Sequence, residues 1–263
     1  MNNTLYPPVI QASLPNQSLL VFRANLGAFT LLSLIIYAAI LLLGAISVFW
    51  IAPSPDTYPI NLLALWNNLG VLRKLLIFLL LVIAAPLLVS RGFAAAIIVV
   101  KEAQAGNRCG AFRALGMVRW KSLRLFWLAW VLSFIPPFFQ GIFVGLILSP
   151  TFPIAVIEEL GVRQAFARSG KLNKNAWGRI VLLFLIYNFL ILAITVFAFV
   201  ILNPILSGVT SAVAAGIWII LILLTGMWYM TALTLNYFDR RRLYEEPTTS
   251  HINPEFDAAK VNP

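Results

Sequence analysis

The chain contains repeated apolar runs that are long enough to cross a bilayer as helices. One of them reads LLIFLLLVIAAPLLV over residues 75–89, and the whole chain is 61% hydrophobic and 11% charged. A helix needs about 20 apolar residues to cross ~30 Å of hydrocarbon, where every backbone polar group must be hydrogen-bonded within the segment. The runs are apolar on all sides, without the alternation of a membrane barrel. We therefore predict an all-α, polytopic membrane helix bundle.

The hydropathy pattern divides the chain into about six transmembrane helices. We place them near residues 28–50, 75–100, 123–136, 137–157, 177–202 and 211–237. The third and fourth share only about 36 residues, and two prolines interrupt this stretch where the turn should fall, so short tilted helices or one broken hairpin would both fit. We predict one integral membrane domain over residues 1–240 and a polar, disordered tail over residues 241–263.

Positive charge is concentrated in one set of the connections between these helices, with Arg73 and Lys74 on the opposite side as the one exception. Lys and Arg recur over residues 101–124, 163–179 and 240–242, whereas the turns SFIPPFF and LNPILSGVTS carry no charge. Such residues accumulate on the cytoplasmic side of a membrane. The pattern therefore predicts cytoplasmic amphipathic connecting helices, with the N and C termini both in the cytoplasm.

The connection after the fourth predicted span is amphipathic. Small or apolar residues recur at intervals of three and four, at Val162, Ala165, Phe166, Ser169 and Leu172, with basic residues opposite. Cations on such a helix attract anionic headgroups, each by about 1 kcal/mol near the surface. The candidate contacts of the two basic connections with anionic lipid are Arg113, Arg119, Lys121, Arg163, Arg168 and Lys171.

Two adjacent acids, Glu158 and Glu159, precede this amphipathic helix. We expect them in its first turn, where the positive end of the helix dipole stabilises negative charge by about 0.3–1 kcal/mol. The alternative is a specific partner inside the bundle or in another protein.

Arg91 is the cation that lies deepest in a predicted span. It is about nine residues, or ~14 Å along a helix, from Lys101 at the basic end. An ionisable residue at this depth is a functional hypothesis by default, and snorkelling to the headgroups is the alternative. We predict a charge cluster in which Arg91 contacts Glu158 or Glu159.

Two further patterns concern packing and repetition. Gly141 and Gly145 in GIFVG have the spacing that lets two membrane helices approach closely, although such a match also arises by chance. EAQAGNRCGAFRALGMVRWKSLRLFW and EELGVRQAFARSGKLNKNAWGRIVLLF both place an acid, glycines and Ala-Phe before a basic stretch and an apolar run. Either an internal repeat or the common needs of a membrane-surface connector would explain this likeness.

The segment FPIAVIEELGVRQAFARSGKLNKNAWGRI (152–180), together with the closing LTLNYFDRRRLYEE (233–246), resembles a family of bacterial proteins. These are six-helix integral membrane proteins related to the membrane domain of glycerophosphoryl diester phosphodiesterases. The resemblance implies a multi-pass module of the bacterial inner (plasma) membrane. The soluble catalytic barrel of those enzymes is absent, so their reaction is not implied.

No residue pattern in the chain indicates catalysis. There is one histidine, His251, in the polar tail and one cysteine, Cys109, so we expect no catalytic residue, metal site or cofactor. The net charge of +10 is explained by topology, and nucleic acid is not an expected partner. We predict a non-enzymatic accessory or assembly subunit that binds membrane lipid or a partner protein. The alternative is a transporter, channel or lipid-moving protein.

Overall fold

The structure of the protein, a computed structural model, is built from α-helices. It describes residues 14–51, 71–120, 123, 124, 128, 150–174, 177–198 and 209–245. The helices are α1 (Leu14–Ala24), α2 (Leu26–Ile51), α4 (Val71–Gln104), α5 (Ala111–Met117), α8 (Thr151–Ile157), α9 (Val162–Leu172), α10 (Trp177–Val196) and α12 (Val209–Glu245). These described residues contain no strand, which confirms the all-α class.

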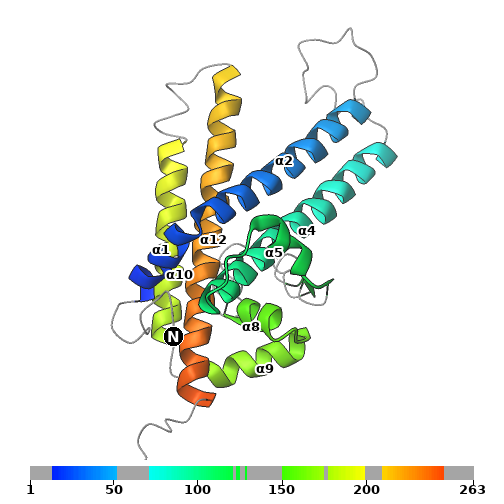
Figure 1. The fold of residues 1–263 in the computed structure, drawn as a ribbon. Coiled ribbons are helices and arrows are strands. Elements are labelled where there is room, and N and C mark those ends of the chain that lie inside the picture. The colour runs from blue at the N-terminus through cyan, green and yellow to red at the C-terminus, as the bar shows by residue number, and fades with distance from the viewer. Residues whose placement is uncertain are drawn as a thin grey trace, which may run out of the picture.

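Two pairs of long helices form the frame of the molecule. α2 packs against α4 and α10 packs against α12, and the two pairs diverge toward one end (Figure 1). α1 packs against α12 and is joined to α2 at Asn25, whose side-chain amide donates to the Val21 carbonyl at 2.9 Å. The stacked rings of Phe22 and Phe29, 4.9 Å apart, stabilise this junction.

Three short helices, α5, α8 and α9, gather beside the end of α4 and the lower half of α12 (Figure 1). We call these three helices the cap. α4 has 34 residues and α12 has 37. At 1.5 Å per residue they are ~50 Å and ~55 Å long, which exceeds the ~30 Å of a hydrocarbon core. The cap packs beside one end of both helices.

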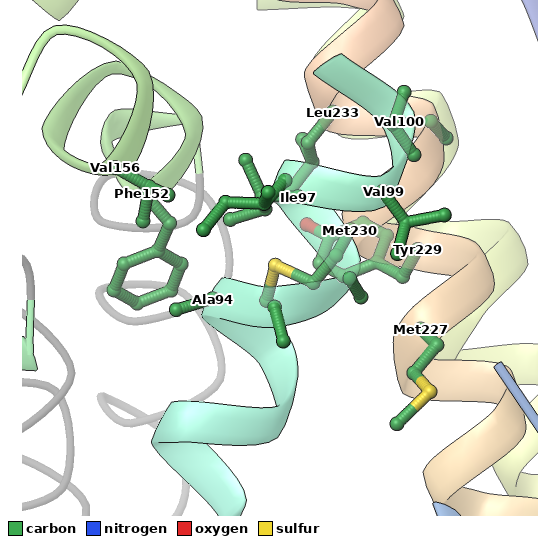
Figure 2. Packing of buried hydrophobic residues seen from close by; sticks show 14 of the residues in the cluster. Ala94, Ile97, Val99, Val100, Phe152, Val156, Met227, Tyr229, Met230 and Leu233 are labelled. Carbon is green, nitrogen blue, oxygen red and sulfur yellow. The ribbon is translucent and has the colours of Figure 1, made fainter. Parts of the chain in front are cut away.

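The apolar core lies where α4 passes between the cap and α12 (Figure 2). Residues 94–100 of α4 are all buried. Seven consecutive residues cover nearly two helical turns, so this stretch is enclosed on every side. Phe152 and Val156 of α8 pack on one side of it, and Met230 and Leu233 of α12 pack on the other.

Three helices in the described part of the chain are long and apolar enough to cross a membrane. They are Leu26–Leu43 within α2, Trp177–Val196, and Ala215–Glu245 within α12. Leu185 and Phe189 are among the large apolar side chains of α10 that remain exposed, as a helix in contact with lipid requires.

The expectation of six crossing helices is not supported by the described residues. The predicted second span, residues 75–100, falls within α4, which is not among these three helices. Most of residues 123–149, which contain the predicted third span and the start of the fourth, lie outside the described residues. The end of the fourth forms only α8, whose seven residues are too short to cross a bilayer.

The long helices cross closely at glycines. A Cβ atom at Gly226 of α12 would lie 2.7 Å from Cζ of Phe93 in α4, closer than real Cβ atoms approach another atom. Added Cβ atoms would also collide with α2 at two other crossings, Gly92 against Ile36 and Gly216 against Tyr37. These small residues leave room for side chains of the neighbouring helix, and small residues are common where membrane helices cross.

Candidate functional site

The chain turns between α8 and α9 at the two adjacent glutamates. Glu158 ends α8 and donates its backbone N–H to the Ile154 carbonyl at 3.0 Å. Glu159 has a φ of 55°, a left-handed conformation that costs a residue with a side chain about 1–2 kcal/mol. α9 starts only at Val162, and its first turn contains no acid. The expectation that both glutamates occupy that turn is wrong, because they form the connection that precedes it.

Five side chains from this connection, α9 and α12 form a closed ring of polar contacts. The Tyr237 hydroxyl donates to Glu158 Oε1 at 2.8 Å, and Arg168 Nε lies 3.3 Å from both oxygens of the same carboxylate. Arg168 also pairs with Glu245. Arg241 closes the ring, since it donates to Glu245 Oε2 at 2.9 Å and to the Tyr237 hydroxyl at 3.3 Å. We call this set the charged ring.

The charged ring is electrically balanced and partly buried. It contains two carboxylates and two guanidinium groups, and the side chains of Glu158 and Arg168 are only 19% and 30% exposed. Hydrogen bonds to charged groups contribute about 1.5–3 kcal/mol each when they are shielded from water. The ring therefore ties the cap to the end of α12, and Arg168 is engaged inside the protein rather than free to meet headgroups.

The ring also includes residues beyond the expected end of the membrane domain. α12 continues to Glu245, so the boundary expected after residue 240 falls inside this helix. Tyr237, Arg241 and Glu245 are spaced four residues apart and therefore lie on one helix face. This spacing in the sequence is the signal that could have placed all three in the folded domain.

The second glutamate has a different partner. Glu159 forms an ion pair with Arg119, which follows α5, and the two side chains are 43% and 68% exposed. Exposed pairs contribute about 0–1 kcal/mol. The adjacent acids thus have two different partners. Glu158 joins the cap to α12, and Glu159 joins the connection between α8 and α9 to Arg119, which follows α5.

Arg91 does not join the glutamates. Its side chain is exposed, and Nη2 donates to the Leu115 carbonyl near the end of α5 at 3.3 Å. The carboxylates of Glu158 and Glu159 pair with Arg168 and Arg119 instead, and no ion pair among the described residues joins either of them to Arg91. The expected contact is absent because α5 lies over Arg91 and offers a backbone acceptor nearby.

A second polar contact fixes the start of α10 against α12. Arg179 donates to Asp239 Oδ2 at 2.7 Å, and the Asp239 side chain is 12% exposed. Nearby, the buried Asn236 donates to Asn173 Oδ1 at 3.3 Å, and Asn173 donates to the Ser169 carbonyl at 3.1 Å. The first contact joins α12 to the start of α10, and the second joins α12 to Asn173 at the end of α9.

α5 and α9 begin in the same way. Each follows an extended glycine, Gly110 or Gly161, and the carbonyl of that glycine accepts from the N–H of Ala114 or Ala165. Both alanines are completely buried. A left-handed residue also precedes each helix, Gly106 in one case and Glu159 in the other. The shared geometry accords with the similarity of the two sequence segments.

The remaining predicted site residues are either exposed or lie outside the described residues. Arg113, Arg163 and Lys171 are exposed, and no ion pair among the described residues neutralises them. Lys121, Gly141 and Gly145 lie outside the described residues. The glycine crossings at Gly92, Gly216 and Gly226 were not predicted, because which glycine meets a neighbouring helix depends on the tertiary arrangement.

Cys109 follows α4 and is buried. Burial and, secondly, the charge of Glu102 raise the pKa of its thiol above the ordinary value, against a partly opposing effect of Arg113. Little reactive thiolate is then present at pH 7, so we predict that maleimide labels native Cys109 at least about tenfold more slowly than the unfolded chain. The native rate should rise steadily as the pH increases toward this raised pKa. Mass spectrometry of timed samples measures both rates, and rapid native labelling that is flat above neutral pH would contradict the prediction.

The described residues contain no group of three or more His, Cys, Asp or Glu side chains that could hold a metal ion. No family model, curated protein or solved structure matches the chain. Its class is therefore defined by the fold: an all-α protein with helices able to cross a membrane and a cap of short helices at one end.

Proposed function

We propose that the protein is a non-enzymatic, multi-pass membrane protein whose cap binds anionic lipid, and that it acts as an accessory or assembly subunit. The observation that carries this proposal is the surface of α5. Arg113 is exposed there beside Phe112, which is 71% exposed, and Trp120 just after the helix is 62% exposed. Exposed aromatic rings beside cations are typical of segments that lie at a membrane interface.

The distribution of ion pairs supports a net positive cap. Arg168 and Arg119 neutralise the carboxylates of Glu158 and Glu159. The charges of Arg113, Arg163 and Lys171 remain without a counter-charge among the described residues. Such cations attract anionic lipid within about a Debye length of the surface.

The membrane topology is part of the same proposal. Six spans with both termini in the cytoplasm would place the cap at the inner face of a bacterial plasma membrane. The resemblance to the membrane domain of glycerophosphoryl diester phosphodiesterases favours this arrangement. In that orientation the cations of the cap face the leaflet that attracts them.

The subunit proposal is favoured over transport by the polar groups of α12. The hydroxyls of Thr225, Thr231 and Thr234 each donate to the carbonyl four residues earlier, at 2.7–2.9 Å. Each hydroxyl thus pairs with a backbone carbonyl of its own helix, as threonine does in helices packed among apolar neighbours. The hydroxyl hydrogens are therefore used within the helix and are not available to donate to a solute.

Purification in mild detergent from the native membrane tests the proposal. Native mass spectrometry should show retained anionic phospholipid, and the F112A/R113Q variant should retain several-fold less of it. The control G170A changes a residue of α9 where nothing lies within 4 Å of an added Cβ, and it leaves the cationic surface intact. If a stoichiometric protein partner co-purifies and no anionic lipid is retained, the lipid-binding part of the proposal is wrong and the subunit binds a protein instead. A lone protein with a defined solute in a central cavity would overturn the proposal.

A further inference from the structure

A cavity that is widely open to solvent lies between the ends of α4 and α12, and Arg241 and Glu245 of the charged ring form part of its lining. Its volume is about 610 Å³, which is within the range of small-molecule sites. The lining residues come from these two helix ends alone and are Lys101, Gln104, Ala105, Phe238, Arg241, Arg242 and Glu245.

The lining of the cavity is strongly basic. It contains three cations and one carboxylate, Glu245, and that carboxylate is shared between Arg168 and Arg241 of the charged ring. No ion pair among the described residues engages Lys101 or Arg242. The charge that remains available in the cavity is therefore positive and is held mainly by these two side chains.

The ring gives this cavity a fixed wall. Arg241 is held by Glu245 at 2.9 Å and by the Tyr237 hydroxyl at 3.3 Å, so its guanidinium is oriented before any ligand arrives. A preoriented guanidinium loses little conformational entropy on binding an oxyanion. Phe238 adds an apolar surface, and the Gln104 amide adds a group that can donate a hydrogen bond.

We propose that this cavity binds a phosphoryl group, with Lys101 and Arg242 as its principal charged contacts. A phosphoryl group offers several oxygens to convergent Lys and Arg donors, which suits three cations around one space. It would belong either to a soluble phosphate ester or to a phospholipid headgroup. In the second case the inference rests on the proposed lipid-binding function and gives it a defined site.

The soluble ligand is tested with the purified full-length protein at constant ionic strength. Titration calorimetry with inorganic phosphate and with glycerol 3-phosphate should show saturable binding. The K101Q/R242Q variant should raise the Kd at least about tenfold, since two charged contacts are lost. The control R23Q/K174Q removes the same charge from exposed positions outside the cavity and outside the proposed lipid-binding surface, and it should change the Kd less than about twofold. Arg241 is left unchanged in both variants, so the charged ring stays complete.

The lipid source is tested in nanodiscs of phosphatidylcholine that contain a small fraction of phosphatidic acid. Lipid retained by each variant is counted by native mass spectrometry. Selective loss in K101Q/R242Q in either experiment supports the site, and the experiment that shows it identifies the source. Equal behaviour of the two double variants in both experiments, or no binding by the wild type in either, overturns the site. Loss of retained lipid only in F112A/R113Q would support the proposed lipid-binding function and overturn this site. Binding of glycerol 3-phosphate by a protein that retains no lipid would support this site and overturn the lipid-binding function.

Discussion

Glu158→Ala is expected to lower the free energy of unfolding by about 2 kcal/mol, because it removes the central acceptor of the charged ring. The Tyr237 hydroxyl and Arg168 Nε both lose their contacts with this carboxylate. The Glu158 side chain is only 19% exposed, so water replaces these contacts incompletely. Thermal unfolding in detergent measures the loss of stability, and limited trypsin digestion should show faster cleavage within α9 as the cap separates from α12.

The neighbouring residue supplies the matched control for this change. Glu159→Ala removes an ion pair whose side chains are 43% and 68% exposed, and we expect a loss below about 1 kcal/mol. Both substitutions remove the same charge at adjacent positions of one connection. Equal destabilisation by the two variants would show that the charged ring contributes no more than a surface pair.

Features that depend on local sequence were predicted well. The period of three and four residues after Gly161 predicted an amphipathic helix, and α9 buries Ala165, Ser169 and Leu172 as that period requires. The all-α class followed equally from the apolar runs. Both are properties of a segment and its immediate surroundings, so they need no knowledge of the tertiary arrangement.

The partners of the charged groups could not be predicted in this way. Arg168 and Glu245 are separated by 77 residues, and their pairing depends on where the end of α12 meets the cap. The left-handed conformation at Glu159 had no signal either, because glycine or asparagine is the usual residue there. The prediction that Arg91 meets a glutamate relied on opposite charge and on the expected position of the glutamates at the inner end of the fourth span. In the structure Arg91 donates to the backbone carbonyl of Leu115 instead.

Helix crossings show the same limit of sequence reasoning. GIFVG drew attention to Gly141 and Gly145 through spacing, whereas the described crossings use single glycines such as Gly226. What identifies Gly226 is the aromatic ring of Phe93, which comes from a helix more than 100 residues earlier in the chain. The close approach of α4 and α12 at this point also positions the buried segment of α4 beneath the cap.

Gly226→Ala is therefore expected to destabilise the protein by about 1–3 kcal/mol, because the new methyl group would displace the Phe93 ring from a packed position. Thermal unfolding in detergent measures the change. Gly170→Ala is the control: this glycine lies within α9 with no atom within 4 Å of an added Cβ, so the helix propensity of alanine should leave stability unchanged or increase it. Phe93→Leu should recover part of the loss when combined with Gly226→Ala, since a smaller side chain frees the space that the methyl group needs. Equal effects of the two alanine substitutions, or strict additivity with Phe93→Leu, would contradict a steric crossing at this site.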